Sequence, residues 1–413
     1  MKTMKFKPSE VGPVPVDWEV KRLGGCCKKI GSGATPTGGA TVYLSHGVSL
    51  IRSQNVYNGY FKYEGLAHIT DSAASALDGV TVQDDDVLLN ITGDSVARCT
   101  KVPADVLPAR VNQHVAIIRT CSEELGSDYL QCYLASPDMQ TYMLNAASGQ
   151  GGSRNAMTKG MVEDFQIPIP PLPEQKAIAE ALSDVDALLA AITKLIEKKR
   201  AIKQGAMQEL LTGKKRLAGF TGKWVEKRLG DVCELNPPGG GIPDRFVYID
   251  LESVVDGALI GRKIVEKCCA PSRAQRRFKR GDILFQTVRP YQKNNLFVDF
   301  EAARYVASTG YAVLRGLPGI GCSAFVYYVL HTDGFTGEVL DRCTGTSYPA
   351  INPGKLAEIT LRLPQEVVEQ QAIAAVLSDM DAEIAVLESK RAKYESIKQG
   401  MMQELLTGRV RLV

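Results

Sequence analysis

Residues 174–213 read EQKAIAEALSDVDALLAAITKLIEKKRAIKQGAMQELLTG, and residues 369–408 read EQQAIAAVLSDMDAEIAVLESKRAKYESIKQGMMQELLTG. The two segments align without a gap, and about 23 of about 40 positions are identical, far more than chance allows. The chain therefore contains an internal repeat, and its clearest part has the composition of a long helix.

Both segments carry apolar residues at alternating steps of four and three, the spacing of a coiled-coil seam. The first seam is Ile178, Leu182, Val185, Leu189, Ile192 and then Ile196. The second is Ile373, Leu377, Met380, Ile384, Leu387 and then Arg391 and Tyr394. Prolines precede each segment, and Gly213 and Gly408 end them as expected C′ residues. We predict two helices that pack as an antiparallel coiled coil with pseudo-two-fold symmetry.

Weaker copies precede each helix in the same order: WEVKRLG (18–24) matches WVEKRLG (224–230), and DVLLNIT (86–92) matches DILFQT (282–287). Short apolar runs between Gly, Pro, Asn and Asp predict strands joined by turns. We therefore predict an α+β chain of two globular modules with curved, mostly antiparallel sheets, each followed by a long helix. The predicted boundaries are 1–171 for the first module, 172–213 for the first helix, 214–365 for the second module and 366–413 for the second helix.

The composition is that of a folded chain with no extreme charge. Its 413 residues suit two or three domains, with 45% hydrophobic and 23% charged residues. A net charge of +3 neither requires nor excludes a nucleic-acid partner. The first ten residues lack the apolar core of a signal peptide, and no run approaches the ~18 apolar residues of a membrane span. Ten cysteines without a CxxC pair are expected to be reduced thiols, so we expect a soluble, cytoplasmic protein.

Three segments resemble catalytic motifs only weakly. Asn236-Pro237-Pro238 matches the start of an adenine-methyltransferase motif, but Gly239 stands where the stacking aromatic belongs. The GxGxxA match at 319–324 lacks the surrounding βαβ pattern, and the acidic run 250–253 lacks the lysine of a nuclease motif. A turn or a loop is the better interpretation of each. We predict no catalytic residue, no metal site and no cofactor in this chain.

The signal for nucleic-acid binding is stronger. Between residues 262 and 293, ten basic residues face two acidic ones, a local charge of about +8 that suits phosphates. Within this stretch TVRPYQKNN (287–295) combines guanidinium, phenol and amide groups, which are suited to base edges. Any one such segment is equally well explained as an ordinary polar loop, but their recurrence in both modules favours DNA. The candidate DNA-binding residues are Arg52, Gln54, Asn55, Tyr57, Asn58, Thr92, Arg98, Asn112, Gln113, His114, Ser153, Arg154, Asn155, Arg276, Arg277, Thr287, Arg289, Tyr291, Gln292, Lys293, Thr346, Ser347 and Tyr348.

Taken together, these segments resemble the specificity subunit of type I restriction–modification enzymes. The resemblance covers nearly the whole chain and rests above all on IPIPPLPEQKAIAEALSDVDALL (167–189), its EQQAIA counterpart, and helices ending twice in LLTG. It implies that each module is a target recognition domain for one half of a split DNA sequence. It also implies that the helices dock two methyltransferase subunits, with two motor–nuclease subunits completing the restriction form.

The same resemblance implies that S-adenosylmethionine, ATP and Mg²⁺ bind to the partner subunits. The assembled complex would then be a site-specific deoxyribonuclease and adenine-N6 methyltransferase, and this chain its non-catalytic subunit. Because the modules diverge outside the repeated segments, the half-sites are expected to differ. One departure is that LNPPGGG (235–241) replaces the Gly-Ser-Gly-Ala-Thr-Pro segment of the first module, so equivalent loops need not do equivalent jobs.

Two other functions stay open on the sequence alone. A self-contained methyltransferase or nuclease would need the cofactor and metal motifs that the sequence lacks. An adaptor with two coiled-coil arms and no role in DNA binding would not need the basic, amide-rich loops.

Overall fold

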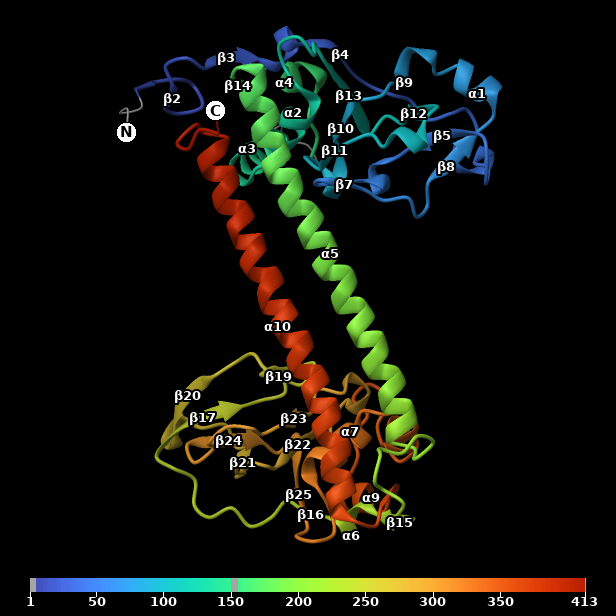
Figure 1. The fold of residues 1–413 in the computed structure, drawn as a ribbon, viewed down its shortest axis with the longest axis vertical. Helices are drawn as coiled ribbons and strands as arrows, with labels where there is room; N and C mark the ends of the chain where they lie inside the picture. Colours follow the sequence, from blue (N-terminus) through green and yellow to red (C-terminus); the bar gives the residue numbers. More distant parts are fainter. Residues whose placement is uncertain (1–4, 150–154, 413) are drawn as a thin grey trace. The chain divides into compact units, whose positions relative to one another are not determined.

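The computed structural model describes residues 5–149 and 155–412, which fold into two compact units. The first unit comprises Met1–Thr193 and Ser389–Val413, and the second comprises Lys194–Glu388. Each unit is therefore one module with half of each long helix, α5 (Leu172–Leu210) and α10 (Val367–Leu405) (Figure 1). The predicted boundaries at 171/172 and 365/366 mark where each module ends and its helix begins along the chain. In three dimensions each module packs against half of each helix, so module and half-helices form one unit.

From β3 in the first unit and β15 in the second, the strands of the two units follow the same order. In the first unit the elements are β1 (Phe6–Lys7), β2 (Val14–Pro15), β3 (Glu19–Arg22), β4 (Cys27–Ser32), β5 (Val48–Ile51), β6 (Val56–Tyr57), β7 (Tyr60–Phe61), β8 (Ala67–Ile69), α1 (Asp71–Ser75), β9 (Thr81–Val82), β10 (Val87–Asn90), β11 (Cys99–Lys101), β12 (Ala109–Val111), β13 (Val115–Thr120), α2 (Ser127–Leu134), α3 (Pro137–Ser148), α4 (Lys159–Glu163) and β14 (Gln166–Ile169), followed by α5. In the second they are β15 (Trp224–Arg228), α6 (Leu229–Val232), β16 (Cys233–Leu235), β17 (Arg245–Ile249), β18 (Val254–Val255), β19 (Ala258–Leu259), β20 (Lys263–Glu266), β21 (Ala274–Arg276), β22 (Ile283–Gln286), β23 (Leu296–Phe297), β24 (Tyr305–Ser308), β25 (Tyr311–Gly316), α7 (Ser323–Leu330), α8 (Asp333–Asp341), α9 (Pro353–Ala357) and β26 (Thr360–Pro364), followed by α10.

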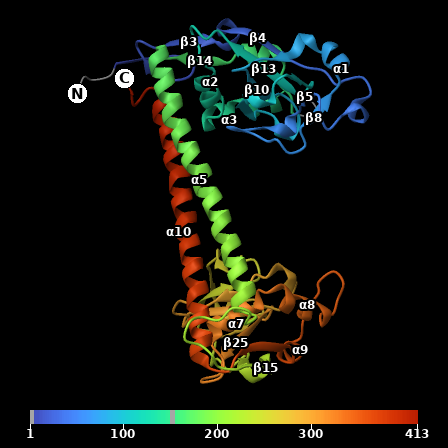
Figure 2. The same ribbon diagram turned by 45° about the vertical axis from the view of Figure 1, so that its right-hand side comes forward.

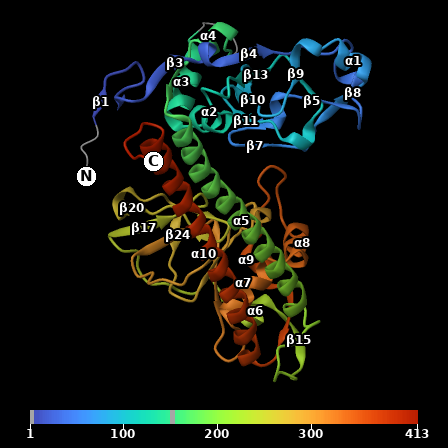
Figure 3. The same ribbon diagram turned by 45° about the horizontal axis from the view of Figure 1, so that its top comes forward.

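Each module contains two four-stranded sheets. In the first module their strand orders are β11-β10-β13-β4 and β8-β5-β12-β9 (Figure 3). In the second module they are β16-β25-β22-β23 and β20-β17-β24-β21 (Figure 1). Within these sheets the pairs β5–β12 and β17–β24 are parallel, and the other pairs are antiparallel. The predicted α+β fold with repeated, mostly antiparallel modules is confirmed.

Strand β10 shows how the cores are layered. Val87 and Leu89 point into the large core of the first unit, which also contains apolar residues of α2, α3, α5 and α10. Leu88, between them, points into the core shared with Ile51 and Val111 of the second sheet. Because side chains alternate along a strand, a strand buried on both faces reads as a continuous apolar run. This is why VLL in the first module and ILF in the second lack the alternation of a surface strand.

The two long helices pack on each other within each unit (Figure 2). In the first unit Ile178 and Leu182 of α5 share a core with Met402 and Leu405 of α10. In the second unit the C-terminal end of α5 packs in the same way on the N-terminal half of α10. The predicted antiparallel coiled coil is confirmed. Of the predicted seam, Ile178, Leu182, Ile192, Ile373, Leu377 and Ile384 are buried, and Val185, Leu189, Met380 and Leu387 are half-buried.

Equivalent ion pairs join the helices across the seam. In the first unit the Lys398 ammonium lies 2.6 Å from the Asp186 carboxylate. In the second unit Lys203 pairs with Asp381, at the positions that the sequence repeat makes equivalent. These side chains are only partly exposed, so the pairs contribute more to orientation than pairs on an open helix surface would.

The repeated Glu-Gln at the start of each helix is buried and holds the module to the helix. Gln175 donates to the carbonyls of Glu124 and Pro170, both at 2.9 Å, and accepts from the N–H of Gly126 at 2.8 Å. Gln370 makes the same three bonds in the second unit. A glutamine that satisfies all its polar groups in this way explains why the motif occurs at both helix starts.

The glutamate of the same motif binds an arginine that follows the other helix. Arg411 contacts the fully buried Glu174 through two nitrogens and also bonds to Asp17 at 2.8 and 3.0 Å. In the second unit Arg216 binds Glu369 at 2.6 and 2.7 Å. Gly213 and Gly408 turn the chain toward these arginines with φ angles of +71° and +70°. A Cβ at Gly408 would lie 2.4 Å from Pro15, so the turn requires glycine.

Candidate nucleic-acid interface

The two modules place one loop in the same way, directly after an inner strand. In the first module Gly93 donates its N–H to the carbonyl of Asn155 at 2.9 Å. In the second module Arg289 donates its N–H to the carbonyl of Pro349 at 2.7 Å. The loops that follow β10 and β22 are therefore structurally equivalent, and both belong to the segments predicted to bind DNA.

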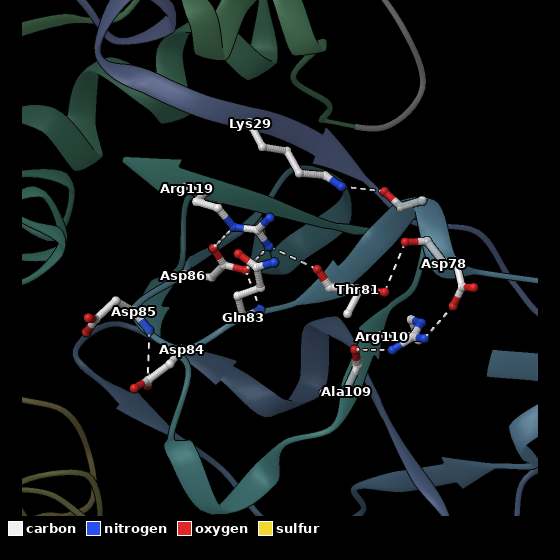
Figure 4. Close-up of polar contacts among 11 residues, drawn as sticks. Lys29, Asp78, Thr81, Gln83, Asp84, Asp85, Asp86, Ala109, Arg110 and Arg119 are labelled. Carbon is white, nitrogen blue, oxygen red and sulfur yellow. Dashed lines mark hydrogen bonds and ion pairs between the residues drawn. The ribbon is translucent and has the colours of Figure 1, made fainter. Parts of the chain in front are cut away.

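A buried aspartate beside each of these strands neutralises an arginine. Asp86 accepts two hydrogen bonds from Arg119, both at 2.8 Å (Figure 4). Asp282 accepts two from Arg315, both at 2.7 Å, and these bonds raise the pKa of Arg315. Both aspartates are fully buried. These arginines therefore stiffen the sheet, and their charge is already compensated.

Polar and aromatic side chains line an open pocket of about 600 Å³ in the first module. Its walls include Tyr57, Thr92, Arg98, His114 and Asn155. All five were predicted from the sequence as DNA-binding residues, and they come from four separate segments of the chain. The fold thus gathers guanidinium, imidazole, phenol and amide groups around one opening, the mixture that recognises base edges and phosphates.

Arg98 has no acidic partner among the described residues and is held on an aromatic support. Its guanidinium carbon lies 4.7 Å from the centre of the Tyr57 ring. Tyr57 is itself stacked on Tyr60, with ring centres 4.9 Å apart and an angle of 17° between the rings. Cation–π contact orients a guanidinium without using its N–H donors. Those donors remain available to an external acceptor.

His114 belongs to a chain of hydrogen bonds at the edge of this pocket. The Gln113 amide nitrogen lies 3.0 Å from Nε2 of His114, and the Thr92 hydroxyl lies 2.5 Å from Nδ1. The Gln113 amide carbonyl accepts from the hydroxyl of Thr35 at 2.5 Å. The amide of Gln113 and the hydroxyl of Thr92 therefore hold the imidazole ring of His114 from both of its nitrogens. The network fixes the side chains that border the pocket.

In the second module the equivalent loop carries Arg289 in place of Gly93. Arg289 has φ 54° and ψ 53°, a left-handed conformation that costs a non-glycine residue about 1–2 kcal/mol. Its guanidinium carbon lies 4.2 Å from the ring centre of Tyr348, which is 64% exposed. Its Nε is buried and has no hydrogen-bond partner among residues 5–149 and 155–412. Strain and an unsatisfied donor together at one residue are typical of a functional position.

The remaining predicted residues near Arg289 differ in exposure and in their contacts. Tyr291 of the same loop is exposed, as are Thr346 and Ser347 beside Tyr348 in the segment before α9. Lys293 instead bonds to the carboxylate of Asp333 at 2.7 Å, which lowers the pKa of that carboxyl. Gln292 is exposed and accepts a hydrogen bond from Gln286 at 2.8 Å.

Three predicted residues lie beneath the surface. Asn55 is fully buried and bonds to the backbone of Arg52 and Lys62. Asn112 accepts from the N–H of His114, and the Thr287 hydroxyl donates to the carbonyl of Gly310. Their side chains shape the loops from inside, and burial takes them out of the candidate interface.

Further predicted residues are exposed or half-buried but already make internal bonds. Arg52 and Gln54 both donate to the carbonyl of Gly65, and Arg277 donates to the carbonyls of Tyr305 and Ala303. Carbonyl contacts leave the arginine charge uncompensated. Asn58 bonds to Gln140 and accepts from the N–H of Cys99. Arg276 is half-buried, and its Nε has no hydrogen-bond partner in the part of the chain that the structure describes. Ser153 and Arg154 lie outside the described residues.

Two aromatic residues that support arginines were not predicted. Tyr60 stacks under Tyr57, and the ring centre of Tyr43 lies 4.9 Å from the guanidinium of Arg52. The tyrosines that flank Asn58-Gly59 could have revealed the first of them, because an Asn-Gly turn brings its neighbours together across a hairpin. Tyr43 lies too far from Arg52 in the sequence for any pattern to connect them.

The weak catalytic motif at Asn236 is a structural turn. Asn236 donates its N–H to the carbonyl of Val313 at 2.7 Å and accepts from the Val313 N–H through its side chain at 3.0 Å. Within residues 5–149 and 155–412, no three His, Cys, Asp or Glu side chains gather so that they could hold a metal ion. In the same part of the chain, no helix has the length and apolar composition needed to cross a membrane.

Comparison with known proteins gives one consistent result. The model of the type I restriction modification DNA specificity domain matches residues 15–204 and 221–396. The chain is similar to the type I restriction enzyme MjaVIII specificity subunit of Methanocaldococcus jannaschii, at 24% identity over 437 residues that cover 100% of this chain and 97% of the relative. It is also similar to the type I restriction enzyme HindI specificity subunit of Haemophilus influenzae, at 25% identity over 191 residues, or 44% of this chain and 40% of the relative.

Solved structures share the fold. The S subunit of a type I restriction-modification system from M. genitalium superposes with a TM-score of 0.63 at 14% identity, covering 98% of this chain and 97% of that one. A chain from work on the complex assembly and conformational transition of a type I R-M system gives a TM-score of 0.55 at 20% identity, covering 96% and 99%. Because the family model matches most of both repeats, this chain belongs to the specificity subunits of type I restriction–modification systems.

Proposed function

We propose that the chain recognises an asymmetric, bipartite DNA sequence and brings methyltransferase and restriction subunits to it. Each module reads one half-site, and the paired helices dock two adenine-N6 methyltransferase subunits. Two motor–nuclease subunits complete the restriction form. S-adenosylmethionine, ATP and Mg²⁺ bind to those partners, and this chain supplies specificity without catalysis.

One observation carries the proposal: each module holds, at the same loop, an arginine that is stacked on a tyrosine and has no described acidic partner. These are Arg98 on Tyr57 and Arg289 on Tyr348. Most other buried or half-buried arginines of the modules are neutralised, as in Arg119 with Asp86 and Arg315 with Asp282. A free guanidinium that is held in place can bond bidentately to guanine O6 and N7, or to a phosphate.

The modules differ at this loop, which supports unlike half-sites. The stacked arginine of the second module stands at the position of Gly93, whereas that of the first module comes five residues later, at Arg98. Two guanidinium groups that leave the scaffold at different points reach different positions in a groove. A continuous or palindromic recognition sequence is therefore not expected.

The proposal is tested by expressing the chain with its methyltransferase subunit and mapping methylated adenines on genomic DNA. We expect a single motif of two unlike half-sites separated by unspecified bases. A continuous or palindromic motif would contradict the bipartite reading. A stable complex that methylates no defined motif would contradict DNA recognition and favour the adaptor function.

Substitution of Arg289 should separate backbone strain from DNA recognition. We expect Arg289→Gly to be about 1 kcal/mol more stable than Arg289→Ala, because only glycine relieves the left-handed conformation. Both variants lose the guanidinium, so both should lose affinity for the second half-site equally. Urea unfolding and DNA titration of the two variants provide the measurements. Equal stability of the two variants would show that the left-handed conformation imposes no strain.

A further inference from the structure

Each module contains a short hairpin, built in the same way, beside the loop discussed above. In the first module β6 and β7 are joined through Asn58-Gly59, and in the second β18 and β19 are joined through Asp256-Gly257. Both hairpins end in the same backbone bond: Lys62 N–H to Asn55 at 2.8 Å, and Ile260 N–H to Ser253 at 2.9 Å. The two hairpins are therefore equivalent, although their sequences have little in common.

The cross-strand pairs of these hairpins divide into an inner and an outer pair. Val56 pairs with Phe61 and Val254 pairs with Leu259, and both of these pairs pack into a core between the sheets. The outer pair of the first hairpin is Tyr57 with Tyr60, the stacked support of Arg98. The outer pair of the second hairpin is Val255 with Ala258, and both residues are exposed. An apolar pair thus occupies the surface position that the tyrosines hold in the first module.

The second hairpin is fixed against the loop that carries Arg289. The N–H of Asp256 donates to the side chain of Asn294 at 3.2 Å. A Cβ on Gly257 would lie 2.5 Å from the hydroxyl of Tyr327, so the tip of the hairpin has no room to move inward. In the first module the hairpin is held to the start of β11, directly after the equivalent loop, by the bond from the Cys99 N–H to the side chain of Asn58 at 3.0 Å.

The surroundings of the apolar pair favour DNA bases as its partner. Ile260, directly after the hairpin, is 66% exposed. Arg262 and Lys263, which follow it closely, are exposed and form no ion pair with any described residue. These cations suit phosphates on either side of a groove. The carboxylate of Asp256 at the tip repels phosphate but can accept from the amino group of cytosine. The tip of the hairpin is therefore better suited to the base edges inside a groove than to the phosphates that line it.

We propose that the β18–β19 hairpin reads bases in the second half-site and that Val255 and Ala258 contact the C5-methyl group of a thymine. Among the base edges in the major groove, the thymine methyl is the one that apolar side chains recognise. This proposal rests on the DNA-reading function proposed above and names one base class that the second module selects. It predicts an A·T pair in that half-site.

The test removes the methyl group from the DNA and the apolar surface from the protein. The chain is assembled with its methyltransferase subunit, and duplexes carry deoxyuridine in place of each thymine of the second half-site in turn. We expect one replacement to weaken binding about 4-fold, as the loss of one buried methyl group of about 0.8 kcal/mol implies. In Val255→Ser the same replacement should change affinity less than 2-fold, because the contact is already absent.

Ile320→Ala serves as the control, because Ile320 is also an exposed apolar residue but lies outside the hairpin. Its loop is held to the start of α10, where Gln370 donates to the carbonyl of Ile320. This variant should respond to deoxyuridine as the wild type does. An equal response of Val255→Ser and wild type, or a second half-site without an A·T pair, would overturn the proposal while bipartite methylation persists. Loss of methyltransferase binding in Val255→Ser would assign the hairpin to a protein partner instead. If the wild-type complex methylates no defined motif, the DNA-reading function fails, and this proposal fails with it.

Discussion

Arg411→Ala should lower the unfolding free energy of the first unit by about 3–5 kcal/mol, because it leaves a buried carboxylate without its cation. Glu174 is fully buried, and its charge is met by Arg411 and by the indole N–H of Trp18 at 3.1 Å. The same guanidinium also bonds to Asp17. Since Arg411 comes from the C-terminal end and its partners from the N-terminal module and α5, the substitution weakens the join between distant parts of the chain.

Hydrogen exchange of the full chain provides the measurement, because it reports stability locally. Protection should fall in β3, β14 and the start of α5. Arg409→Ala is the matched control: its ion pair with Glu404 spans 3.7 Å and both side chains are about half exposed, so it should contribute ~0–1 kcal/mol. Arg216→Ala should reproduce the loss in the second unit. If the Arg409 and Arg411 variants lost the same unfolding free energy, the buried pair would contribute no more to stability than an exposed ion pair does.

The contribution of Asp17 should depend on pH in a defined direction. Hydrogen bonds from Arg411 hold the pKa of Asp17 below its ordinary value of 3.8. A carboxyl group with a lowered folded pKa contributes its full stability above the unfolded pKa and loses it as the pH falls through the folded pKa. In Asp17→Asn this acid dependence below pH 3.8 should be reduced, as urea unfolding at successive pH values would measure. An unchanged acid profile would contradict the role of this pair.

Arg98→Ala and Arg289→Ala should each weaken DNA binding by about 1–3 kcal/mol, or about 5- to 150-fold, if the guanidinium bonds to a base. The effect should be confined to one half-site. When the first half-site of the DNA is mutated, Arg98→Ala should weaken binding little further. When the second half-site is mutated, the same should hold for Arg289→Ala. The tyrosine rings hold both arginine side chains in place before DNA binds, so binding costs little additional side-chain entropy.

Salt dependence distinguishes the two kinds of contact. An arginine that binds a phosphate changes affinity for all sequences alike, and its loss reduces the salt slope by about 1. Arg22→Ala, which removes an exposed arginine of β3 that lies 3.3 Å from Asp164, is the control for a general loss of charge. Uniform weakening of all sequences in Arg98→Ala or Arg289→Ala would assign these residues to the phosphate backbone. Unchanged binding would remove them from the interface.

The long helices and the strand-rich modules could be predicted because their signals are local. The steps of Ile178, Leu182 and Val185 follow from the helical period alone, and a repeat of 40 residues leaves no doubt that the seam occurs twice. The residue types of the candidate interface were also visible, since amides, arginines and tyrosines gathered in the same segments of both copies.

What no pattern revealed was how segments distant in sequence neutralise or support one another. Arg119 and Arg98 cannot be told apart by their sequence context. In the structure, however, Arg119 is paired with the buried Asp86, whereas Arg98 lies over Tyr57 and has no acidic partner among the described residues. Asn55 has the side chain of a DNA-binding residue, but its amide is buried and donates to the backbone carbonyl of Lys62. In the second module the hairpin at 254–259 has Asp256 as its one polar side chain, and only its backbone equivalence to the hairpin of Tyr57 and Tyr60 identifies it as a candidate DNA contact.

Local periodicity and the internal repeat therefore predicted the repeated fold and the helix seam, and the motifs around the helix starts indicated the family that the match to the family model shows. The choice of which cations and amides face outward depended on long-range contacts such as Arg411 with Glu174, Asp282 with Arg315 and Asp256 with Asn294. The physical reason is that burial and charge pairing are properties of a three-dimensional neighbourhood. The sequence gives the chemical type of each side chain directly. Whether that side chain is available to DNA depends on contacts with residues tens or hundreds of positions away.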